Sequence, residues 1–60
     1  MKFKVEFDCD NDAFVTYPES EIANILKNLA CVVLDGSVYG SIYDSNGNRV
    51  GTWEFDSVDE

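Results

Sequence analysis

The stretch SVYGSIYDSNGNRVGTWEF, residues 37–55, decides the fold. Its alternation of apolar and polar residues predicts two strands joined by a tight turn at Asn46-Gly47. We expect a type I′ turn, because both of its central positions need a positive φ, which Asn and Gly adopt at little cost. This turn sets the pairs Ser45–Asn48, Asp44–Arg49, Tyr43–Val50, Ile42–Gly51, Ser41–Thr52, Gly40–Trp53, Tyr39–Glu54 and Val38–Phe55. The sequence therefore predicts a β-hairpin over residues 37–56.

The register divides the hairpin into two faces. One face carries Val38, Gly40, Ile42, Gly51, Trp53 and Phe55, and the other carries Tyr39, Ser41, Tyr43, Val50, Thr52 and Glu54. We expect the first face to pack into the core, with the indole of Trp53 filling the space beside Gly40. A slip of one residue would turn every side chain to the opposite face.

A further strand is predicted before the hairpin, over residues 2–10, where apolar and polar side chains alternate. Cys9 ends its apolar row, which indicates a small buried hydrophobe. Residues 11–15 form a loop, and we expect Phe14 and Val15 to fold back against the core.

A helix is predicted over residues 17–34. Thr16 and Glu19 have the spacing of a capping box, and Gly36 can take the left-handed conformation that follows a helix end. The apolar stripe of this helix contains Ile22, Ile25, Leu26, Leu29, Val32 and Val33.

The order of elements is β-α-β-β, which predicts a single α+β domain over residues 1–60 with one helix packed on one face of a three-stranded sheet. We favour an antiparallel sheet with residues 49–55 in the centre, since this places Trp53 centrally. A parallel pairing of the first strand with residues 37–43 remains the alternative. Residues 57–60 form an acidic tail.

Charge narrows the classes of function. Twelve acidic residues stand against four basic ones, with no histidine, for a net charge of −8. Direct nucleic-acid binding is not expected, because a phosphate-binding surface needs clustered Lys and Arg. Two cysteines make no disulfide framework, and no signal peptide or membrane-spanning run is evident. We expect a cytoplasmic protein with reduced thiols and no cofactor.

Catalysis is not expected either, because no nucleophile–base pair or carboxylate dyad is evident. A calcium loop is an alternative, since Asp8, Asp10, Asp12 and Glu19 have EF-hand spacing. The pattern departs from an EF-hand because Ala13 stands at the glycine position and because a strand, not a helix, precedes the loop.

Partner binding is the function class that the pattern favours. Tyrosines on an exposed sheet face supply contact area at low entropic cost, and carboxylates can bind a basic surface. The candidate partner-binding residues are Glu6, Asp8, Asp10, Asp12, Glu19, Glu21, Tyr39, Tyr43, Glu54 and Asp56.

The acidic chain and its hairpin pattern, Asp44-x-Asn46-Gly47-Asn48-x-Val50-Gly51-x-Trp53-Glu54-Phe55, resemble small accessory proteins of phages and mobile elements, in particular anti-CRISPR and anti-restriction inhibitors. The resemblance implies a stoichiometric inhibitor that presents carboxylates where a CRISPR effector or restriction enzyme of the host expects phosphates. Two alternatives stay open: a protein-interaction or homodimerisation module that uses the tyrosine face, and a calcium-binding domain.

Overall fold

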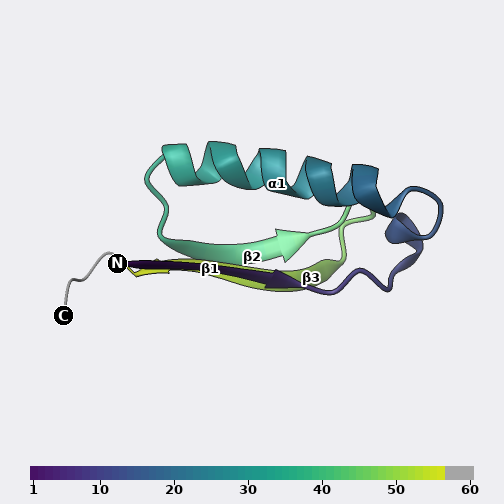
Figure 1. Cartoon of the computed structure of the whole chain (residues 1–60), viewed down its shortest axis with the longest axis horizontal. Helices are drawn as coiled ribbons and strands as arrows, with labels where there is room; N and C mark the ends of the chain where they lie inside the picture. Colours follow the sequence, from purple (N-terminus) through teal and green to yellow (C-terminus); the bar gives the residue numbers. More distant parts are fainter. Residues whose placement is uncertain (57–60) are drawn as a thin grey trace.

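The computed structural model describes residues 1–56. Its elements are β1 (Lys2–Phe7), the 3-10 helix η1 (Asp12–Phe14), α1 (Pro18–Leu34), β2 (Tyr39–Tyr43) and β3 (Arg49–Asp56). The strands form one antiparallel sheet in the order β1-β3-β2, and α1 lies across one face of it (Figure 1). The predicted α+β class and the central position of the last strand are confirmed. The predicted tail, residues 57–60, lies outside the described residues.

Most of the hairpin has the predicted register. Tyr39 faces Glu54, Gly40 faces Trp53, Ser41 faces Thr52 and Ile42 faces Gly51. A Cβ atom built on Gly40 would lie 2.9 Å from Nε1 of Trp53, so the indole does occupy the space that this glycine leaves.

The turn differs from the prediction. The N–H of Gly47 donates to the carbonyl of Asp44 at 3.0 Å, and the N–H of Asp44 donates to the carbonyl of Asn48 at 2.9 Å. Gly47 has a φ of +85°, whereas no residue other than glycine has a positive φ in the described part of the chain. Ser45 and Asn46 therefore occupy a type I turn that is followed by a left-handed glycine, which is the usual three-residue hairpin loop. The prediction of a type I′ turn was wrong.

The longer loop shifts the pairing near the turn. Tyr43 faces Arg49 instead of Val50, and the register slips between Ile42 and Tyr43. Val50 is the extra residue of this bulge and is buried in the core, although it was predicted on the exposed face. A β-bulge interrupts the alternation of side chains between the two faces of a sheet by one residue. Here the bulge places the side chain of Val50 in the core.

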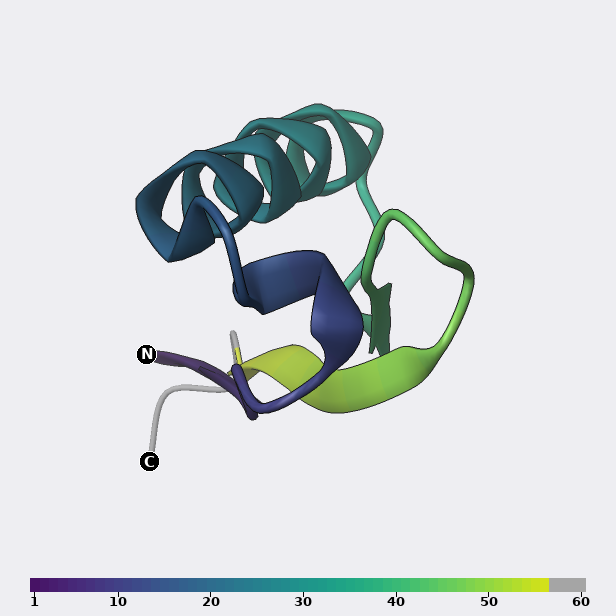
Figure 2. The ribbon, with the colours of Figure 1, turned by 90° about the vertical axis from the view of Figure 1, so that its right-hand side faces the viewer.

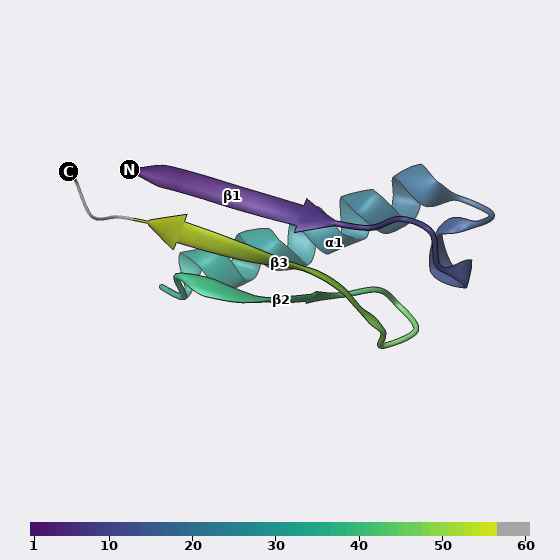
Figure 3. The same cartoon turned by 90° about the horizontal axis from the view of Figure 1, so that it is seen from below.

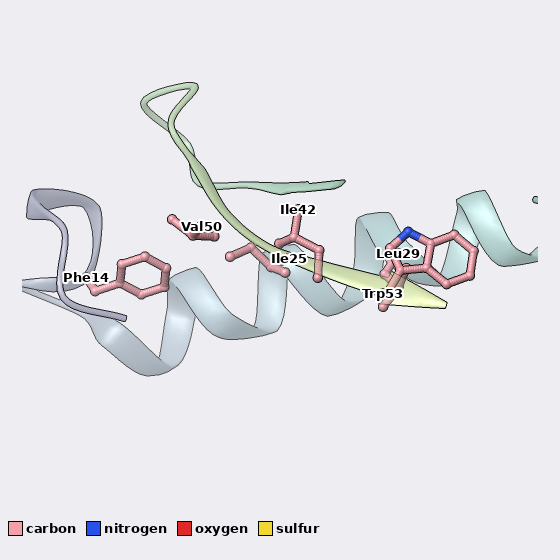
Figure 4. Close-up of a cluster of buried hydrophobic side chains, with 6 residues drawn as sticks. All are labelled: Phe14, Ile25, Leu29, Ile42, Val50 and Trp53. Carbon is pink, nitrogen blue, oxygen red and sulfur yellow. The ribbon is translucent and has the colours of Figure 1, made fainter. Parts of the chain in front are cut away.

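The core is one row of six buried side chains between α1 and the sheet, with Phe14 at one end and Trp53 at the other (Figure 4). The row consists of Phe14, Ile25, Leu29, Ile42, Val50 and Trp53. Figure 2 shows why Phe14 belongs to it: η1 lies between the start of α1 and the sheet and closes that end. The predicted folding back of Phe14 is confirmed, but Val15 is exposed.

Helix α1 begins at Pro18, one residue later than predicted. Tyr17, and not Thr16, is the N-cap, and its side chain makes no capping hydrogen bond. The prediction of a capping box formed by Thr16 and Glu19 was therefore wrong. The physical reason is Pro18, which disfavours the helical conformation for the residue before it and suits the first helical position itself. The helix end agrees with the prediction, because Gly36 follows it with a φ of +100°.

Strand β1 ends at Phe7, three residues before the predicted end. The last hydrogen bond to β3 from this part of the chain joins the N–H of Asp8 to the carbonyl of Val50, the extra residue of the bulge, at 3.0 Å. Beyond this point the chain leaves the sheet for η1. Cys9 is consequently exposed, and the prediction that it is buried was wrong.

Helix α1 covers the sheet unevenly. It runs diagonally behind the sheet and ends over β2, so the first part of β1 has no helix behind it (Figure 3). Phe3 is 45% exposed and Val5 is 38% exposed, although both lie on the apolar side of β1. Phe3 contacts its neighbours on β3, since its ring centroid lies 5.7 Å from that of Trp53 and 6.3 Å from that of Phe55.

Candidate partner-binding surfaces

The sheet face opposite α1 is the first candidate surface. Tyr39 and Tyr43 lie on it and are 77% and 56% exposed. Tyr39 borders a shallow depression of about 540 Å³ on this face. Its lining includes Lys4, Glu6, Tyr39, Ser41, Arg49, Thr52 and Glu54. Side chains of both signs of charge therefore line the depression.

The carboxylates of this face do not form a negative patch. Lys4 faces Glu54 and Lys2 faces Asp56 across the β1–β3 pair. Cross-strand neighbours of opposite charge attract each other and lower the local field. Glu6 faces the neutral Thr52 instead. The sheet thus brings together five of the predicted site residues in a setting of mixed charge: Glu6, Tyr39, Tyr43, Glu54 and Asp56.

The connection between β1 and α1 is the second candidate surface. The connection carries the exposed carboxylates of Asp8, Asp10 and Asp12, and the first turn of α1 adds that of Glu19; we call these four residues the acidic end. Residues 5–26 contain no lysine or arginine. The connection lies at one extremity of a molecule that is 42 Å long (Figure 1). Arg49, at the start of β3, is the basic residue that the fold brings to the same extremity.

The carboxylate of Glu21 is bonded within the fold. It is only 8% exposed, and its Oε2 atom accepts a hydrogen bond of 2.8 Å from the N–H of Ser45 in the hairpin loop. The carboxylate thus joins the first turn of α1 to the loop between β2 and β3. Glu21 was predicted as a partner-binding residue, but its carboxylate is occupied within the fold.

Asp44 is a second structural carboxylate, and it was not among the predicted partner-binding residues. Its Oδ2 atom accepts a hydrogen bond from Nδ2 of Asn11 at 2.9 Å, and its Oδ1 atom accepts the N–H groups of Asn46 and Asn48 at 3.0 and 2.9 Å. The hydrogen bond from Asn11, then those from Asn48 and Asn46, hold the pKa of Asp44 below its ordinary value, although desolvation acts in the opposite direction. A signal existed in the sequence, since Asp at the first position of a turn often bonds the backbone two residues on.

The residues of the calcium alternative do not gather around a point. Within residues 1–56, no group of three or more His, Cys, Asp or Glu side chains is placed to hold a metal ion. Asp8, Asp10, Asp12 and Glu19 therefore share an end of the molecule without forming a coordination site. Cys9 and Cys31 are exposed free thiols.

No protein-family model, curated protein or solved structure matches the chain. In the part of the chain that the structure describes, no helix is long and apolar enough to cross a membrane.

Proposed function

We propose that the protein is a stoichiometric inhibitor whose acidic end binds a cationic groove of a host nucleic-acid-binding complex, such as a CRISPR effector or a restriction enzyme. The observation that supports this proposal is the set of four exposed carboxylates, Asp8, Asp10, Asp12 and Glu19, on a segment without a basic residue. Such a complex is met in the cytoplasm of an infected cell. No catalytic step and no cofactor are part of the proposal.

The charge density sets the scale of the mimicry. A DNA duplex carries one negative charge per ~1.7 Å of its axis, or about 25 over the 42 Å of this molecule. The net charge of −8 is about a third of that value. The chain is thus too weakly charged to replace a length of duplex, but its acidic end can occupy a few lysine and arginine sites that otherwise bind phosphates.

The mechanism is electrostatic competition. A carboxylate and a phosphate both accept hydrogen bonds from guanidinium and ammonium groups. Long-range attraction raises the association rate with a basic groove, and added salt screens it. Inhibition that depends on the acidic end therefore weakens as the ionic strength rises.

The test is a titration of purified CRISPR effector nucleases and restriction enzymes with the protein, with DNA cleavage as the readout. We expect inhibition of one of them to be complete near an equimolar ratio, and duplex DNA to compete. A triple variant, Asp10→Asn, Asp12→Asn and Glu19→Gln, should lose inhibition. The matched control changes three exposed carboxylates elsewhere, Glu6→Gln, Asp35→Asn and Glu54→Gln, with the same effect on net charge. Equal losses in both triple variants would show that net charge, and not the acidic end, is responsible; no inhibition of any enzyme would refute the proposal.

The tyrosine face is a second candidate interface. Tyr39 and Tyr43 are both largely exposed on this face, and Tyr39 borders the depression. Exposed aromatic side chains are typical anchors of protein interfaces. Binding through this face should fall for Tyr39→Ala and Tyr43→Ala and should depend little on salt. The triple acidic-end variant should leave such binding intact, which separates the two candidates.

A further inference from the structure

The outer edge of β1 has backbone groups with no partner strand in the described part of the chain. The N–H of Asp8 donates to Val50 of β3, and the same register runs along the whole β1–β3 pair. In an antiparallel pair, residues alternate between bonding toward the partner strand and away from it. The even-numbered residues of β1 therefore bond to β3, and the N–H and C=O groups of Phe3, Val5 and Phe7 point to the open edge.

The side chains next to this edge are incompletely covered. Phe3 and Val5 lie on the helix side of β1, but α1 crosses toward β2 and leaves both more than a third exposed (Figure 3). An open edge with exposed apolar side chains is the feature by which sheets associate. Natural edges usually carry charges that prevent association. The edge strand β1 and the residue after it carry charges of both signs.

The charged side chains of β1 and of the residue after it are complementary to those of a second copy that runs antiparallel. Lys2 and Lys4 precede Val5, and Glu6 and Asp8 follow it at the same distances. If a second copy is turned by 180° about an axis at Val5, Lys4 faces Glu6 of the second copy. Lys2 likewise faces Asp8 of the second copy, and the symmetry doubles both pairs.

The backbone supports the same register. Pairing about Val5 places Val5 against Val5 and Phe3 against Phe7, and these odd-numbered residues are the ones whose N–H and C=O groups point outward. A shift by two residues also satisfies the backbone, but it places Lys4 against Lys4 or Glu6 against Glu6. Like charges directly opposite each other are destabilising. Charge thus selects one register among those that the hydrogen bonds allow.

We propose that β1 pairs edge to edge with β1 of a second copy, in the register centred on Val5, to form a two-fold symmetric dimer with a continuous six-stranded antiparallel sheet. Phe3 and Phe7 then become neighbours across the new pair and cover apolar surface that α1 leaves open. The outer edge of β2 has no comparable complementarity, because Tyr39–Tyr43 contains no charged residue. The dimer uses a different surface from the tyrosine face, and it does not depend on the proposed inhibitory function.

Sedimentation equilibrium over a wide range of concentrations tests the dimer. The chain has a mass of 6.7 kDa, and we expect the wild-type protein to approach twice this mass as its concentration rises. The variant Glu6→Lys should stay monomeric, because the introduced lysine faces Lys4 of the second copy at two places. Glu6 faces Thr52 within its own sheet, so this change should leave the fold intact, which far-UV circular dichroism checks.

Complementation identifies the register. The variant Lys4→Glu should also be monomeric alone, but an equimolar mixture of Lys4→Glu with Glu6→Lys should recover the dimer mass, since every facing pair is again of opposite charge. Glu19→Lys changes the net charge as Glu6→Lys does, at an exposed site outside β1, and should dimerise normally. A monomeric wild-type protein at all concentrations would overturn the proposal. So would a dimer that survives Glu6→Lys or that is lost in Tyr39→Ala.

Discussion

The side-chain amide of Asn11 donates a hydrogen bond of 2.9 Å to the carboxylate of Asp44, 33 residues further along the chain. The other oxygen of the same carboxylate accepts the backbone N–H groups of Asn46 and Asn48. One side chain therefore shapes the hairpin loop and fastens it to the segment that leads into η1. Because the fold is small, each such attachment is a large part of its stability.

The first prediction concerns the pH dependence of unfolding. The pKa of Asp44 is lower in the folded protein than its ordinary value, so the charged form stabilises the fold. This stabilisation is complete above the ordinary carboxyl pKa of about 4, and it is lost as the pH falls through the lower folded-state value. We expect Asp44→Asn to lower the urea midpoint at neutral pH and to flatten its fall in acid. A variant that keeps the wild-type acid dependence would show that another carboxylate causes it.

The second prediction separates Glu21 from Glu19, two acids in the same turn of α1. Glu21→Ala removes the acceptor of the Ser45 N–H and should cost about 1.5–3 kcal/mol in the free energy of unfolding, the range for hydrogen bonds to charged groups. Glu19 is exposed, so Glu19→Ala should change stability by less than about 0.5 kcal/mol. Urea denaturation of both variants measures the difference, and equal losses would contradict the assigned role of Glu21.

The third prediction concerns the packing of Trp53 against Gly40. A methyl group at position 40 would lie 2.9 Å from Nε1 of the indole, so Gly40→Ala should displace the ring and cost about 1–3 kcal/mol, as overpacking does. The tryptophan fluorescence should shift, because this is the one tryptophan of the chain. Ser41→Ala, at the exposed neighbouring position, is the control and should change neither quantity.

The fourth prediction tests the turn. Gly47 has a positive φ and Asn46 does not. Gly47→Ala should therefore cost about 1–2 kcal/mol, the penalty of a left-handed residue with a Cβ atom, whereas Asn46→Ala should cost less than about 0.5 kcal/mol. In a type I′ turn both positions would have been sensitive. Thermal denaturation of the two variants distinguishes the turns.

The pattern of neighbouring residues predicted those parts of the fold that interactions between neighbouring residues determine. The alternation of residues 37–43 and 51–56 fixed which side chains face the helix, and the glycine after α1 marked its end. The turn was harder, because Asn-Gly suits both a two-residue loop and the end of a three-residue loop. The carboxylate of Asp44, which bonds the two amides of the longer loop, decides between them. The bulge and the burial of Val50 follow from that choice.

The candidate surfaces were harder to predict, because they depend on contacts between segments that are distant in the sequence. Glu19 and Glu21 look equivalent in the sequence, and only the position of the hairpin loop makes one structural and leaves the other exposed. Likewise, the lysines that face Glu54 and Asp56 come from the other end of the chain. The acidic end could be predicted as a run without basic residues, but its separation from the sheet face required β1 to end at Phe7.

The pairing of β1 with β3 also determines the order in which the protein can assemble. Every contact of this pair, from Lys2 with Asp56 to Phe7 with Gly51, joins the two extremes of the sequence. Such contacts form late in folding, because closing the long loop between the two strands costs entropy. The hairpin and the helix form earlier, because their contacts are local. During synthesis on the ribosome, β1 emerges before β2 and β3, so its phenylalanines stay exposed to water until the residues of β3 have been added.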